Sequence, residues 1–74
     1  MAMRELIRDL TAVAVVRDLP ERKLVAGQVG TVVEVLDKDV FEVEFTDDEG
    51  RTYATAALKR EDLMVLHYAP VMAV

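Results

Sequence analysis

The sequence predicts an all-β domain, a small five-stranded SH3-like barrel with a 3-10 turn before the last strand. Val40–Thr46 alternates apolar and acidic side chains, which is the period of a strand with one buried face. Gly27 and Gly30 flank the start of a valine-rich run, where a small barrel needs its sheet to bend. The chain of 74 residues has the length of one domain, and its 53% hydrophobic and 31% charged content is typical of a globular fold.

The first ten residues (1–10) form either a lead-in or a short helix. Met3, Leu6, Ile7 and Leu10 fall at helical intervals with charged residues between them. So short a segment does not hold helicity without packing, and both structures stay open.

Five strands, separated by turn residues, follow over residues 11–67. Pro20 ends the first strand, Asp37-Lys38-Asp39 and Asp47–Gly50 suit tight turns, and Leu24 and Val25 are expected to cover the barrel mouth. The second turn leaves no room for the helix that an oligonucleotide-binding barrel usually carries there. We expect strands over Thr11–Arg17, Val29–Leu36, Val40–Thr46, Arg51–Ala57 and Leu63–His67, with the 3-10 turn over Leu58–Asp62.

Missing residue types argue against catalysis. The sequence has no cysteine, serine, asparagine or tryptophan, and His67 is its only histidine. Nucleophilic catalysis needs a nucleophile beside a base, and zinc sites need several histidine or cysteine ligands. We therefore expect no enzyme activity, no metal and no cofactor. No leader peptide is recognisable, and the longest apolar run without a proline, Ala12–Val16, is too short for a membrane span, so a cytoplasmic protein without membrane association is expected.

The third strand and its two turns carry a run of acidic side chains that Lys38 alone opposes. Such a run forms either a solvated face that protects the sheet from aggregation or a surface that docks a basic partner. The spacing does not fit a calcium loop. The candidate partner-binding residues are Asp37, Asp39, Glu42, Glu44, Asp47, Asp48 and Glu49.

The C-terminal segment, residues 68–74, is apolar throughout. A tail of this kind frays, packs locally or mediates self-association, because a small barrel gains stability by burying more surface. The candidate self-association residues are Tyr68, Pro70, Val71, Met72 and Val74.

Two resemblances accompany these patterns. The segment Val25–Val35 resembles the core of the KOW motif of ribosomal and transcription-factor barrels, although barrels of that kind that bind RNA are usually basic. More extensively, the chain resembles a family of short bacterial proteins described only as a domain of unknown function, which implies an SH3-like barrel and carries no known site residues. The stretches that carry this second resemblance are Val16–Glu21, Gly27–Val35, Phe41–Phe45, Asp48–Ala54, Leu58-Lys59 and Leu63-Met64.

The net charge of the chain ranks the functional hypotheses. A net charge of −5 repels phosphate backbones and favours basic protein surfaces as partners. The leading hypothesis is a non-enzymatic protein-interaction module that masks a basic partner, as a small accessory or antitoxin-like protein would. One form of this hypothesis makes the module a homo-oligomer. The alternatives are an accessory subunit of an enzyme or electron-transfer complex and a KOW-like RNA-binding domain. The RNA hypothesis requires five basic residues to cluster on one rim, namely Arg17, Arg22, Lys23, Lys59 and Arg60.

Overall fold

The computed structural model describes residues 6–67, which form strands and two single-turn 3-10 helices, η1 and η2. Nothing in this part of the chain is a helix long and apolar enough to cross a membrane. In chain order the elements are β1 (Ala12–Val15), η1 (Pro20–Arg22), β2 (Val29–Asp37), β3 (Val40–Thr46), β4 (Thr52–Lys59), η2 (Arg60–Asp62) and β5 (Leu63–Val65).

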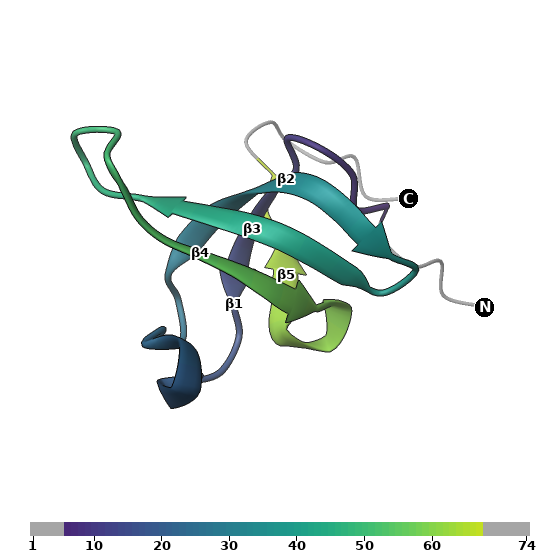
Figure 1. Cartoon of the computed structure of the whole chain (residues 1–74), viewed down its shortest axis with the longest axis horizontal. Coiled ribbons are helices and arrows are strands. Elements are labelled where there is room, and N and C mark those ends of the chain that lie inside the picture. Colours follow the sequence, from purple (N-terminus) through teal and green to yellow (C-terminus); the bar gives the residue numbers. More distant parts are fainter. Residues whose placement is uncertain (1–5, 68–74) are drawn as a thin grey trace.

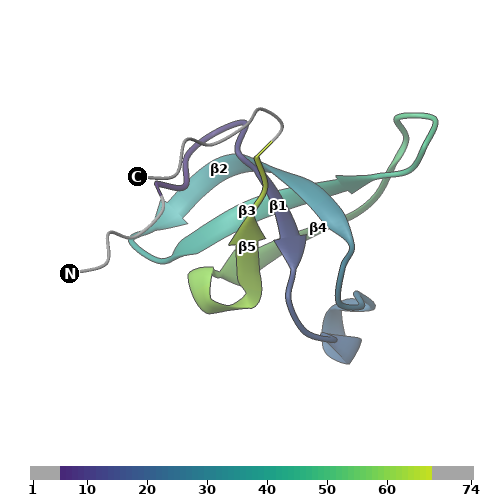
Figure 2. The ribbon, with the colours of Figure 1, turned by 180° about the vertical axis from the view of Figure 1, so that it is seen from behind.

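All strands belong to one antiparallel sheet with the order β4-β3-β2-β1-β5. Figure 1 shows the sheet coiling, so that β1 and β5 cross the layer of β2, β3 and β4, and the view from behind in Figure 2 shows the same crossing. The predicted all-β, SH3-like class with a 3-10 turn before the last strand is confirmed. The sheet is not closed, because β4 and β5 are its two ends and do not pair with each other among the described residues.

The observed strand boundaries agree best with the predicted ones where apolar and polar side chains alternate. Val40–Thr46 is a strand over its predicted length. The fourth strand begins and ends later than the predicted Arg51–Ala57, because its ladder with β3 continues until Lys59 lies opposite Val40. The 3-10 turn therefore begins at Arg60, and the last strand ends at Val65.

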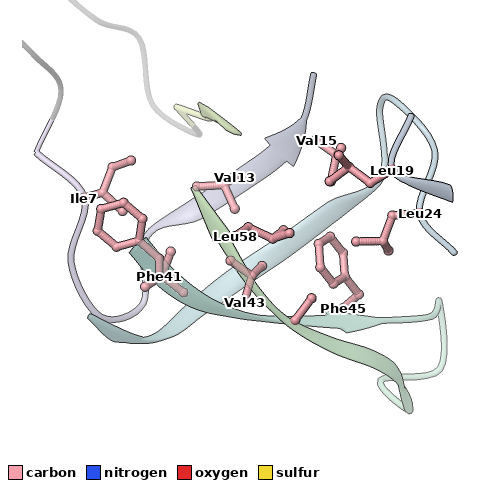
Figure 3. Close-up of a cluster of buried hydrophobic side chains, with 11 residues drawn as sticks. Ile7, Val13, Val15, Leu19, Leu24, Phe41, Val43, Phe45 and Leu58 are labelled. Atoms are coloured by element: carbon pink, nitrogen blue, oxygen red, sulfur yellow. The ribbon is translucent and has the colours of Figure 1, made fainter. Parts of the chain in front are cut away.

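The core lies between the two crossing layers of the coiled sheet. Phe41, Val43 and Phe45 on β3 are at most 1% exposed, whereas Glu42 and Glu44 face the other side, as the alternation predicted. Every residue of β1 is buried, which explains its unbroken apolar sequence. Figure 3 shows side chains from β1, β3 and β4 meeting between the layers.

The loop after β1 is part of this core. Leu19 and Leu24 exchange two backbone hydrogen bonds, at 2.8 and 3.1 Å, and both side chains are buried. The prediction that Leu24 covers the end of the barrel is confirmed. The same prediction for Val25 is wrong, because its side chain is 55% exposed.

The segment before β1 is a lead-in over its described part. Residues 6–10 form no helix, and Leu10 has a φ of 72°, which breaks any helical course. Ile7 is buried beside Phe41, while Leu6 and Leu10 are exposed, so the helical spacing of these side chains does not mark a buried face. The predicted tail over residues 68–74 lies outside the described residues.

Candidate functional site

The acids of the β3–β4 hairpin tip hold their own turn. The Asp47 carboxylate accepts hydrogen bonds from the backbone N–H groups of Glu49 and Arg51, each at 2.9 Å. It also pairs with the Arg51 side chain at 3.2 Å, and that guanidinium bonds Glu49 as well. Asp47 and Glu49, two of the predicted site residues, are therefore committed to the turn. Of the acids at the tip, only Asp48 makes no side-chain hydrogen bond or ion pair within residues 6–67.

This arrangement predicts how the hairpin tip responds to acid. The backbone N–H of Arg51, and then that of Glu49, lower the pKa of Asp47 because they stabilise its ionised form. A lowered pKa in the folded state means that the turn keeps its full stability above the ordinary aspartate value and loses it as pH falls through the lowered value. An NMR titration of the Glu49 and Arg51 amide signals should show this transition, absent in Asp47→Asn and unchanged in Asp48→Asn.

The acids of the β2–β3 turn are also engaged. Asp37 accepts a hydrogen bond from the backbone N–H of Lys38 at 2.7 Å. Asp39 pairs with Arg60 at 2.9 Å, and the Arg60 guanidinium lies 5.2 Å from the centre of the Phe41 ring. The predicted acidic run is thus divided by the structure, and its two ends are built into turns.

The middle of the run forms a different surface with one further residue. Glu42 lies directly opposite Glu34 of β2, and Glu44 lies opposite Thr31, all on the side of the sheet that faces away from the core. We call Glu34, Glu42 and Glu44 the glutamate face. Within residues 6–67 no cation is paired with any of them, and no group of three or more acidic or histidine side chains is placed to hold a metal ion.

Glu34 was missed by the sequence analysis. It stands between apolar residues in Val29–Leu36 and gave no alternation to assign its face. The only available signal was that it is the single charged side chain in that predicted strand. A lone charge in an apolar strand must point outward or find a partner.

The basic residues gather at the opposite end of β4. Arg17, Arg22 and Lys59 line one cleft of about 160 Å³, together with Glu21 and Asp62. Arg17 donates to the buried Asp62 carboxylate at 2.6 Å, and this hydrogen bond raises the pKa of the guanidinium. Three of the five basic residues that an RNA-binding rim requires therefore lie together in this cleft, with two acidic residues among them.

The other two basic residues, Lys23 and Arg60, do not line this cleft. Arg60 is engaged with Asp39, and Lys23 ends η1 in the left-handed conformation with an exposed side chain. The predicted self-association residues all belong to the segment that lies outside the described residues.

Comparison with known proteins gives a family and no activity. No curated protein and no solved structure matches the chain. A family profile described as "Domain of unknown function (DUF4926)" matches residues 10–65, which span every strand of the sheet. The chain therefore belongs to this family, as its sequence resemblance led us to expect.

Proposed function

We propose that the protein is a non-enzymatic interaction module that docks a basic surface of a protein partner on its glutamate face. The proposal depends on one observation, the direct cross-strand opposition of Glu34 and Glu42, with no cation from residues 6–67 paired to either. Like charges at opposed positions destabilise a sheet by roughly 0.2–1 kcal/mol. A residue pair that weakens the isolated fold is expected where a partner supplies the missing charge.

The surroundings of this face support docking. Thr31, Thr55 and Ala57 are its cross-strand neighbours, and all three are small. These three side chains are too short to cover the carboxylates, and Glu34 is exposed while Glu42 and Glu44 are half-buried. The turn acids at both hairpins add to the same negative field, which steers a basic partner toward the sheet.

Reversing one charge on this face is expected to stabilise the protein and abolish docking together. Glu42→Lys places a cation opposite Glu34, which should add about 0.5–1 kcal/mol and raise the Tm by roughly 3–6 °C. The same change removes the attraction for a basic partner. Thermal unfolding measures the first effect, and recovery of partners by the tagged protein from its own host measures the second.

Asp48→Lys is the matched control, because it changes the net charge equally at the exposed hairpin tip. It should keep the partner and leave the Tm nearly unchanged. Recovery of the same partner by wild type, Glu42→Lys and Asp48→Lys alike would refute a role for the glutamate face. A Tm that falls in Glu42→Lys would refute the electrostatic argument itself.

The biological role that fits this module is accessory. A small acidic domain of this kind serves by masking a basic partner, as an antitoxin-like protein does, or by joining an enzyme or electron-transfer complex as a subunit. The partner recovered in the experiment above separates these roles, because a basic toxin and a larger enzyme differ in size and activity.

RNA binding is a second candidate, favoured by the cleft that gathers Arg17, Arg22 and Lys59. Glu21 and Asp62 in the same cleft, together with the net charge of −5, oppose it. A gel-shift titration with single-stranded RNA at low salt tests this function. Salt-sensitive binding that is lost in Lys59→Gln would establish it, and the absence of binding at micromolar protein would remove it.

A further inference from the structure

The outer side of β4 is an open sheet edge. β4 ends the strand order, and in the described part of the chain no strand lies beyond it. The Ala57 carbonyl points away from β3, because it accepts a 3.4 Å hydrogen bond from Nη2 of Arg22. The Arg60 backbone N–H, three residues further along, points the other way and donates to the Asp39 carbonyl at 2.9 Å. Backbone groups of successive residues alternate between the two sides of a strand, so those of Thr55 also point outward.

Before Ala57, where Arg22 covers the strand, this edge lacks the devices by which proteins protect edge strands. β4 is eight residues long, and between Thr52 and Leu58 it contains neither a proline nor a charge. The other end of the sheet, β5, has only three residues, which limits pairing there. An exposed, uncharged edge strand is a template for another strand.

The side chains of β4 lead from this edge to the glutamate face. Thr55 lies opposite Glu44, and Ala57 lies opposite Glu42. Neighbouring strands are ~4.8 Å apart, so a strand added to β4 would lie ~10 Å from the β3 backbone. Lysine or arginine at alternate positions of such a strand can extend over these small side chains and meet the glutamates, with each side chain covering part of the distance.

We propose that the partner binds as an extended segment, with basic residues at every second position, that adds to β4 as a sixth strand. This inference rests on the proposed function and specifies the class of its partner. Backbone hydrogen bonds of Thr55 supply affinity, and the alternate cations facing Glu42 and Glu44 supply specificity.

Arg22 sets the limit of this added strand. Its guanidinium occupies the Ala57 carbonyl at 3.4 Å, and its charge repels a basic segment at that end of the edge. The segment therefore pairs first around Thr55. Arg22→Ala should extend the pairing and tighten binding several-fold.

The test uses the full chain and a capped peptide that alternates lysine and threonine over the length of a strand, about eight residues. Thr55→Pro removes the outward N–H and leaves the bonds to β3 in place, because proline is tolerated where the N–H of an edge strand faces solvent. We expect this variant to bind at least about tenfold more weakly by NMR titration, and peptide binding to slow amide exchange at Thr55 in the wild type. Thr55→Arg, which keeps the backbone and fills the path to Glu44, should show the same loss if the proline variant does not fold.

The double variant Glu42→Gln/Glu44→Gln separates this inference from the proposed function. If it loses the peptide while both Thr55 variants bind normally, the glutamate face is supported and strand addition is refuted. If neither kind of variant changes binding, both ideas are refuted. An identical peptide with glutamate in place of lysine should not bind. Its binding would refute the requirement for basic residues facing Glu42 and Glu44. If the Thr55 amide is protected without peptide as the protein concentration rises, a second copy occupies the edge and the heterologous partner is refuted.

Discussion

Gly30→Ala is expected to destabilise the domain by about 3 kcal/mol, and Gly30→Val to prevent folding, because overpacking in a full core forces side chains and backbone apart. A Cβ atom at Gly30 would lie 2.6 Å from Cγ1 of Val43 and 2.9 Å from the backbone oxygen of Glu44. The side chain can turn, but the oxygen belongs to the ladder that pairs β2 with β3. A stability of roughly 4–11 kcal/mol for a domain of this length leaves little reserve for the larger substitution.

Gly27→Ala is the control that separates crowding from backbone strain. Gly27 has a φ of 95°, and a Cβ there would meet nothing within 4 Å. Its replacement should cost only about 1 kcal/mol, through the unfavourable φ alone. Urea unfolding of the two alanine variants measures the difference, and equal losses would show that the close approach at Gly30 does not determine stability.

The two glycines also show what the sequence was able to predict. Both were expected to bend the chain at the start of the long strand, and the positive φ of Gly27 agrees with that role. Gly30 acts through a close approach between strands, which depends on the partner strand and is not encoded locally. Alternation in Val40–Thr46 assigned the buried face correctly, because a period of two is a property of a single strand.

The position of Glu34 could not be predicted from the pattern of its own strand. A regular ladder from the pair Asp37 and Val40 would place Glu34 opposite Val43, on the core side. The irregularity between Val35 and Asp37 shifts the register by one residue and brings Glu34 opposite Glu42. A bulge depends on how the sheet coils around the core, so the glutamate face could not be completed from the sequence. The division of the acidic run could not be predicted from the sequence either. Arg51 and Arg60 come close to their acidic partners only after the turns have formed.

Leu24→Ala is expected to cost about 3 kcal/mol although its position is in a loop, because truncating a buried leucine typically costs ~2–5 kcal/mol. The side chain is 1% exposed and lies near Leu19 and Phe45 in Figure 3. Two backbone hydrogen bonds between Leu19 and Leu24 fix the loop that positions it, which limits how far the site can collapse after truncation. Chemical unfolding with an unchanged m-value would identify the loss as one of stability.

The adjacent Val25 is the matched control for this substitution. It is also apolar and one residue away, but its side chain is 55% exposed, so Val25→Ala should change the free energy of unfolding by no more than about 0.5 kcal/mol. A comparable loss in both variants would mean that the loop contributes through its backbone and not through the buried leucine. The expected difference would show that the open end of this small sheet is sealed by the connection between β1 and β2. That seal leaves the outer face and the β4 edge available to a partner without exposing the core.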